Sequence, residues 1–133
     1  MVQIAGKYVQ EKQENFVAFL LAVGIPEEYA KRAETAKTET TIAINGKNIE
    51  ISTKSPNFSR TATYIDGEEV DDSTERHKNT KSVAVLKGDV LEITSKYADG
   101  KTGLRKYTFT DAGYTLELSE TDAPNAVIYN KRV

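Results

Sequence analysis

The side chains that could hold a ligand are an arginine and several hydroxyl-bearing residues spaced two positions apart. Arg105 and Tyr107 have this spacing, and Thr53 and Ser55 have it after two isoleucines. Because side chains two positions apart along a β-strand point to the same face, each pair would share one face of a strand. A guanidinium and hydroxyl groups can hydrogen-bond a carboxylate or water. The pattern therefore predicts a binding site.

The last segment of the sequence, NAVIYNKRV, adds a tyrosine to this set. Val127 and Tyr129 occupy one alternate face of the expected strand, and Ala126 and Ile128 occupy the other. We expect Tyr129 to face the interior, where its hydroxyl group would need a hydrogen-bond partner. Lys131 and Arg132 are expected to be a solvated strand end.

Arg105 and the two tyrosines each have two interpretations that the sequence leaves open. Arg105 is either solvated near the end of a hairpin or turned inward, where its charge needs an anionic or water partner, because an unpaired buried charge costs several kcal/mol. Tyr107 and Tyr129 are either ordinary core aromatics bonded to water or donors to a ligand.

Several kinds of chemistry are not expected. The chain has no cysteine and a single histidine, His77, and it shows no phosphate-binding loop or nucleophile elbow, so we expect neither an enzyme nor a cofactor. An acidic cluster, Glu68, Glu69, Asp71 and Asp72, lacks the spacing of a calcium loop, so no metal is expected and these carboxylates are assigned to solvent. The net charge of −2 does not favour nucleic acid as a partner.

Two short helices are predicted near the start of the chain. In ENFVAFLLAVG, apolar residues recur at three- and four-residue spacing, and Gly24 ends the pattern. The following IPEEYAKRAETAK has Pro26 at a first helical position. The first helix is apolar nearly all round. Its outer side either packs on the second helix or provides a patch for transient contact with a membrane.

From Thr38 onward the sequence predicts only strands. Asn45-Gly46 is a strong hairpin signal, and further Gly-containing turns separate segments of alternating apolar and polar residues. Strands at regular spacing predict an antiparallel meander, and hence a barrel or a sandwich. The side chains expected to face inward are more polar than a packed core, which favours a water-containing cavity. They include Thr53, Ser55, Arg105, Tyr107 and Tyr129.

An ordered series of motifs along the whole chain resembles the intracellular lipid-binding family, the fatty-acid-binding proteins. The series comprises Gly6-Lys7-Tyr8, a first helix QENFVAFLLAVGIPEE most like the liver-type branch, Asn45-Gly46, GEEVD, TKS, and the final Tyr129-Asn130-Lys131-Arg132. The resemblance implies one domain, residues 1–133. Its fold would be mainly β, a ten-stranded antiparallel up-and-down β-barrel (β-clam) capped by a helix-turn-helix lid at about residues 14–36.

The resemblance also implies a function and a site. The function is noncovalent binding and intracellular transport or buffering of long-chain fatty acids, in a cytoplasmic monomer. The family anchors the ligand with two inward arginines and a tyrosine. Here Tyr129 matches the tyrosine, Val127 and Tyr107 stand where arginines are expected, and Arg105 is the proposed substitute. The residues expected at the ligand's portal are Phe16, Leu20 and Phe58.

The missing arginines leave two alternatives. In one, the same barrel binds a bulkier or neutral lipid, such as a bile-acid-like, sterol-like or retinoid molecule. In the other, the barrel is filled by its own side chains, and the apolar first helix is the working surface of an interaction module.

Overall fold

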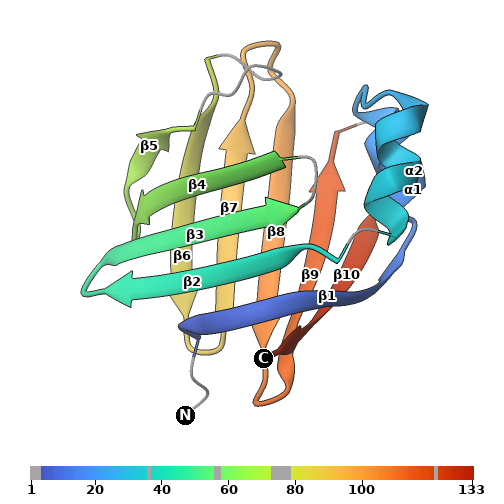
Figure 1. The fold of residues 1–133 in the computed structure, drawn as a ribbon. Helices are drawn as coiled ribbons and strands as arrows, with labels where there is room; N and C mark the ends of the chain where they lie inside the picture. The colour runs from blue at the N-terminus through green and yellow to red at the C-terminus, as the bar shows by residue number, and fades with distance from the viewer. Residues whose placement is uncertain (1–3, 36, 56–57, 73–78, 122) are drawn as a thin grey trace.

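The structure, a computed structural model, describes residues 4–35, 37–55, 58–72, 79–121 and 123–133. It contains two short helices between the first and second strands, as Figure 1 shows. The elements are β1 (Gly6–Glu14), α1 (Phe16–Ala22), α2 (Glu27–Thr35), β2 (Glu39–Asn45), β3 (Asn48–Ser55), β4 (Phe58–Ile65), β5 (Glu69–Asp71), β6 (Lys81–Lys87), β7 (Val90–Lys96), β8 (Thr102–Phe109), β9 (Gly113–Glu120) and β10 (Ala126–Arg132).

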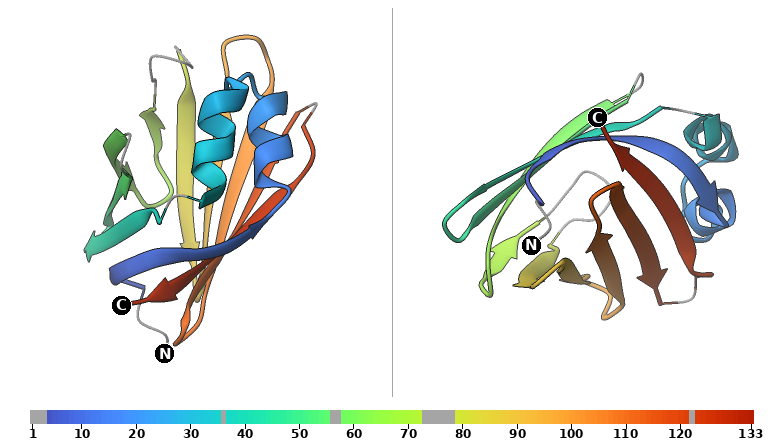
Figure 2. Two further views of the ribbon diagram at one scale, coloured as in Figure 1. Left: turned by 45° about the vertical axis from the view of Figure 1, so that its right-hand side comes forward. Right: turned by 90° about the horizontal axis from the view of Figure 1, so that it is seen from below.

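All ten strands form one sheet in the order β4-β3-β2-β1-β10-β9-β8-β7-β6-β5, and every paired neighbour is antiparallel. The sheet curves back on itself, so that β2–β4 face the later strands (Figure 2). Strands β4 and β5 end the order and are not paired with each other. The expected ten-stranded antiparallel barrel with a helix pair is therefore confirmed, and it is nearly closed.

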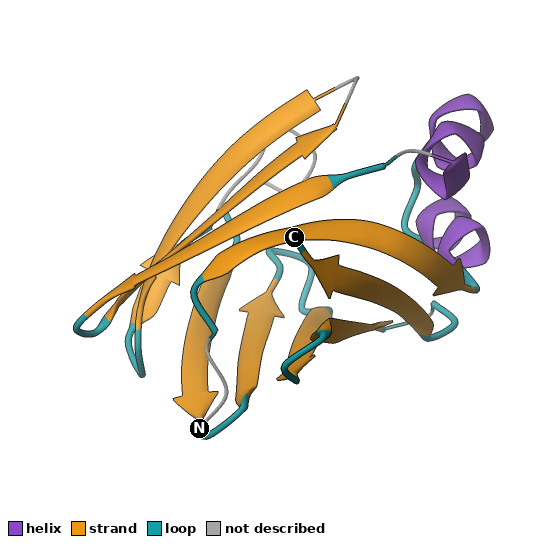
Figure 3. Ribbon diagram, turned by 60° about the horizontal axis from the view of Figure 1, so that its bottom comes forward, coloured by secondary structure: helices purple, strands orange, loops and turns teal. Residues whose placement is uncertain are grey.

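The two helices lie together at one end of the barrel, where β1 leads into α1 (Figure 3). Phe19 of α1 is 6% exposed and packs with Leu118 of β9 and Ile128 of β10, while Phe16 and Leu20 are partly buried beside them. Gly24 ends the helix with φ of +94°, a conformation that glycine adopts without a steric penalty. One apolar face of α1 thus packs on the end of the barrel, whereas Leu21 remains 45% exposed.

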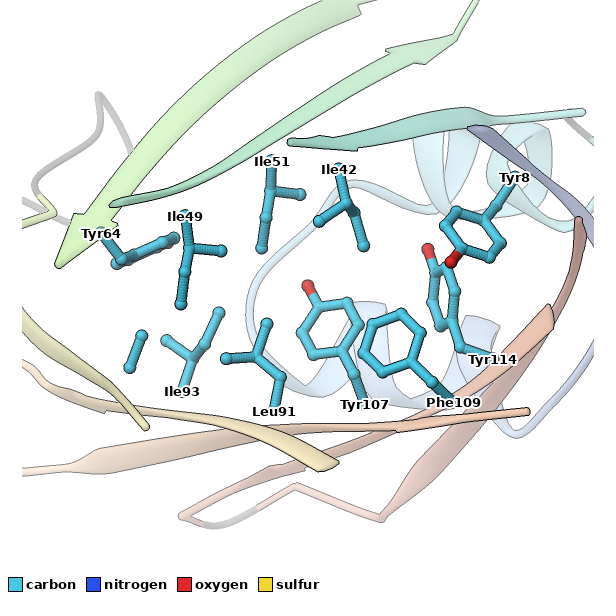
Figure 4. Close-up of a cluster of buried hydrophobic side chains, with 11 residues drawn as sticks. Tyr8, Ile42, Ile49, Ile51, Tyr64, Leu91, Ile93, Tyr107, Phe109 and Tyr114 are labelled. Carbon is cyan, nitrogen blue, oxygen red and sulfur yellow. The ribbon is translucent and has the colours of Figure 1, made fainter. Parts of the chain in front are cut away.

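The opposite end of the barrel is filled by aromatic side chains from β1, β8 and β9. The rings of Tyr8 and Tyr114 are 4.8 Å apart in an edge-to-face arrangement, and Tyr107 and Phe109 stack at 6.2 Å. Figure 4 shows these rings together, with isoleucines of β2 and β3 facing them from the other layer. The described side chains at this end of the barrel are therefore closely packed.

The fold depends on a close approach of two backbones at Gly113, the first residue of β9. A Cβ atom there would lie 2.0 Å from the carbonyl oxygen of Asn130 in β10, which is backbone and cannot rotate away. We expect Gly113→Ala to lower the free energy of unfolding by about 3 kcal/mol or more, because β9 and β10 would have to separate. Urea unfolding measures this, and Asp111→Ala in the preceding exposed turn is the control. Equal stabilities of the two variants would contradict the prediction.

Candidate functional site

The side chain of Arg105 enters the barrel from the middle of β8. Its strand neighbours are Ile93 of β7 and Leu118 of β9, both of which are buried on the inner face. The side chain is 27% accessible, so part of it is not covered by other protein atoms. Of the two orientations that the sequence left open for Arg105, the structure has the inward one, on the same face as Tyr107 and Phe109.

Arg105 is held by a buried carboxylate, Asp72, which follows β5. Its Nη2 donates to Asp72 Oδ2 at 3.3 Å and to the Tyr64 hydroxyl at 2.9 Å, and that hydroxyl donates to Asp72 at 3.0 Å. Arg60 of β4 forms an ion pair with the other oxygen of Asp72. The side chain of Asp72 is 9% exposed, so its charge depends on these partners.

Two serines extend the same network onto the following strands. Ser82 of β6 donates to Asp72 Oδ2 at 2.9 Å, and its hydroxyl is 2.7 Å from that of Ser95 in β7. We call Arg60, Tyr64, Asp72, Ser82, Ser95 and Arg105 the Asp72 network. It joins β4 to β6, β7 and β8 across the place where β4 and β5 are unpaired. With two arginines and one aspartate, the network has a formal charge of +1.

The ionisable groups of the network respond to burial and to each other. Burial raises the pKa of Tyr64, and the positive charge of Arg105 partly offsets this. Burial disfavours the charge on Arg105, but Tyr107, Tyr64 and Asp72 outweigh that effect, and the pKa of Arg105 is raised above its usual value. Arg105 therefore remains a cation inside the barrel.

A cavity of about 110 Å³ lies between Arg105 and the first helix. Phe19 lines it on the helix side and Leu118 on the strand side, and its polar lining comes from Ser95, Tyr97, Arg105 and Glu120. The cavity can hold water molecules or a polar headgroup, because apolar and hydrogen-bonding walls meet there.

Three of the other predicted site residues lie on the inner face. Thr53 and Ser55 are half-buried on β3 with the parity of Ile49 and Ile51, and Thr53 is directly opposite Arg60. Tyr107 is 4% exposed and packs among the aromatic rings of the closed end. Their roles toward a ligand remain predictions.

The expected orientation of Tyr129 is wrong. On β10 the buried residues are Ala126, Ile128 and Asn130, so Tyr129 points outward, with the Lys12 amino group 4.9 Å from its ring centre. Both alternate faces of this strand are apolar, so the sequence did not reveal its orientation. The pairing of β10 with β9 decides the orientation of the strand, because Ile128 is opposite Leu116, which packs against the core.

Arg132 also differs from its expected place. The sequence predicts a solvated side chain, but the guanidinium lies over the Tyr8 ring at 4.9 Å, and Nη1 donates to the Ala5 carbonyl oxygen at 3.4 Å. A cation therefore covers the closed end of the barrel, which helps to hold β10 against β1.

Sequence reasoning missed most of the Asp72 network. Arg60 and Tyr64 could have been found, because Arg60, Ala62 and Tyr64 alternate on one face of β4. Asp72 could not have been found in this way, because its acidic neighbours led to its assignment to solvent. Only the path of the chain after β5 turns its side chain inward. The side chain of Phe58, one of the expected portal residues, and the whole of His77 lie outside the described residues.

The part of the chain that the structure describes contains neither a membrane-spanning helix nor a cluster of metal-binding side chains. Among those residues, no helix is long and apolar enough to cross a membrane. The same part of the chain contains no group of three or more His, Asp or Glu side chains placed to hold a metal ion.

Comparison with known proteins finds fatty acid-binding proteins among the chains that are similar in sequence. The chain is 29% identical over 129 residues to an adipocyte fatty acid-binding protein of Pygoscelis papua, covering 97% of both chains. It is 31% identical over 94 residues to a liver fatty acid-binding protein of Sus scrofa, covering 71% of this chain and 74% of the relative. No family model matches the chain.

Solved structures agree in fold. A REP1-NXSQ fatty acid transporter superposes with a TM-score of 0.87 at 24% identity, covering 98% of this chain and 96% of the other. Lipid binding protein 8 of Caenorhabditis elegans reaches the same TM-score at 10% identity, over 100% and 99% of the two chains. At these identities the likeness shows the fold alone.

The first test of the site concerns the carboxylate of Asp72. We expect Asp72→Asn to lower the free energy of unfolding by about 2 kcal/mol, because it leaves two arginines without their counter-ion while Arg60 can still reach water. Urea unfolding followed by circular dichroism measures the change. The control is Glu69→Gln, which also removes one carboxylate charge but from an exposed position on β5. An equally small effect of the two substitutions on stability would contradict the role of Asp72 as a buried counter-ion.

Proposed function

The chain belongs to the fatty-acid-binding protein family, and we propose on that premise that it binds a long-chain fatty acid or a similar amphipathic lipid noncovalently inside the barrel. The relatives support the lipid class through their names, which are those of adipocyte and liver fatty acid-binding proteins. The observation that carries the proposal here is Arg105, a cation on the inner face that borders a cavity beneath the helix pair.

The binding energy would come mainly from the acyl chain. Each methylene group removed from water contributes about 0.8 kcal/mol, and the inner faces of β9 and β10 near the helices carry the apolar side chains Leu118 and Ile128. A few polar groups would then fix the position of the headgroup. We propose no chemical step on the ligand.

The headgroup would meet the Asp72 network. Its formal charge of +1 matches one carboxylate, and the described contacts of Arg105 all use Nη2, which leaves the other N–H groups of the guanidinium fork for a ligand. Thr53 and Ser55 would add hydroxyl groups from β3. Tyr129 has no part in this role because it points outward.

Access to the cavity would require the helix pair to move. Phe16 and Leu20 lie partly buried between α1 and the barrel, where a ligand leaving the cavity would pass. Transport or buffering of the lipid, the cytoplasmic location, the monomeric state and contact of α1 with a membrane stay predictions.

A neutral lipid is the second candidate ligand, and the ion pairs of the Asp72 network favour it. Asp72 already supplies a carboxylate to both arginines, so a ligand need not bring one. A sterol-like or retinoid molecule with a single hydroxyl group could hydrogen-bond to the network without adding charge.

Native mass spectrometry of the freshly purified protein is the direct test of lipid binding. We expect a fraction of the protein to carry a copurified lipid, whose mass identifies the class, because the apolar inner surface would retain it. Delipidated protein loaded with hexadecanoic acid is the positive control. Protein that is ligand-free and dimeric, and that cannot be loaded, would instead indicate an interaction module with a self-filled barrel.

The role of Arg105 is tested by comparing hexadecanoic acid with its methyl ester on delipidated protein. We expect the acid to bind more tightly and Arg105→Gln to lower its affinity by about tenfold, since a charge-assisted hydrogen bond contributes about 1.5–3 kcal/mol. Lys106→Gln, the adjacent position on the outer face of β8, should bind like the natural protein. Equal affinity for acid and ester would favour the neutral ligand.

A further inference from the structure

A second carboxylate borders the same cavity as Arg105. Glu120, at the end of β9, has the parity of the buried Leu118, and both residues line the cavity. Arg105 is paired with Leu118 and Glu120 with Gly103, so the two charged residues are diagonal neighbours on one face of the β8–β9 ladder. Such neighbours are separated by roughly 7–8 Å between Cα atoms, within reach of long side chains.

Gly103 leaves the space in which Glu120 meets Tyr97. A Cβ atom at Gly103 would lie 2.7 Å from the Tyr97 hydroxyl and 3.0 Å from Cγ of Glu120, so both side chains cross directly over this residue. The hydroxyl of Tyr97 donates a hydrogen bond to the Glu120 carboxylate. That bond fixes the carboxylate at the cavity wall, where a flexible glutamate would otherwise turn to solvent.

The cavity therefore presents an acceptor and a donor together. A carboxylate has about four acceptor positions, so Glu120 retains acceptor capacity beyond Tyr97, and Arg105 retains donors beyond Asp72 and Tyr64. A simple fatty acid satisfies only Arg105. Its carboxylate would also lie near the negative charge of Glu120, which lowers the gain from binding.

We propose that this cavity selects a lipid whose headgroup carries a hydrogen-bond donor close to its carboxylate, with the carboxylate on Arg105 and the donor on Glu120. The donor is a hydroxyl group or an amide N–H within a few bonds of the carboxylate, given the spacing of Arg105 and Glu120. The inference deepens the proposed function and depends on it, since it specifies the ligand of the same site.

The test compares matched ligands on the delipidated full chain. Affinities are measured by isothermal titration calorimetry for 3-hydroxyhexadecanoic acid against hexadecanoic acid, and for N-hexadecanoylglycine against its N-methyl analogue, which lacks the N–H donor. We expect the donor-bearing member of at least one pair to bind about tenfold more tightly, and the pair that discriminates identifies the donor.

Variants assign the discrimination to Glu120. In Glu120→Gln the preference should fall at least severalfold, whereas Glu117→Gln, on the exposed outer face of the same strand, should keep it. Tyr97→Phe removes the hydrogen bond that holds Glu120 at the cavity wall, so it should also lower the preference, which tests the assignment if Glu120→Gln does not fold.

The outcomes separate this inference from the proposed function. Equal affinities within both ligand pairs, or a preference that persists unchanged in Glu120→Gln, would overturn the inference while leaving fatty-acid binding intact. Failure of all four ligands to bind would overturn the proposed function as well.

Discussion

The carboxylate of Asp72 is the constraint on which the ligand side of this barrel depends. Strands β4 and β5 are the ends of the sheet and share no ladder, so the barrel is not closed by backbone pairing there. At one end of this opening, Asp66 and Gly67 hydrogen-bond to the backbone of β6. At the other end of the opening, Asp72 connects side chains of β4, β6 and β8. The opening is thus bridged by polar side chains, which can exchange partners more readily than a strand ladder.

The same carboxylate determines what the interior can bind. Two arginines inside a barrel would strongly favour anions, but Asp72 neutralises one of the two charges and orients Arg105 through its Nη2 atom. Beyond Arg105, Glu120 adds a further negative group to the cavity beneath α1. The interior is therefore nearly balanced in charge, and hydrogen-bonding pattern becomes as important as charge in the choice of ligand.

Packing divides the barrel into two unequal parts. The end formed by the start of β1 and the β8–β9 turn is filled by stacked aromatic rings and covered by Arg132. The end beneath the helices contains the cavity, which Phe19 of α1 lines. A rigid, packed end holds the strands in register, while the helix end depends on side-chain contacts between α1 and two strands. The second end is the one that can open at low cost.

Local sequence pattern is sufficient to predict the order of helices and strands and part of the site. Alternation along β3 and β8 placed Thr53, Ser55, Arg105 and Tyr107 inward, because each strand has one clearly apolar face that must be buried. The orientations of the Tyr129 and Asp72 side chains, in contrast, follow from contacts made in the folded chain. β10 is apolar on both faces, so its orientation depends on pairing with β9, and Asp72 is turned inward by the chain path after a three-residue strand. Local pattern cannot specify either feature, since both result from contacts between residues distant in sequence.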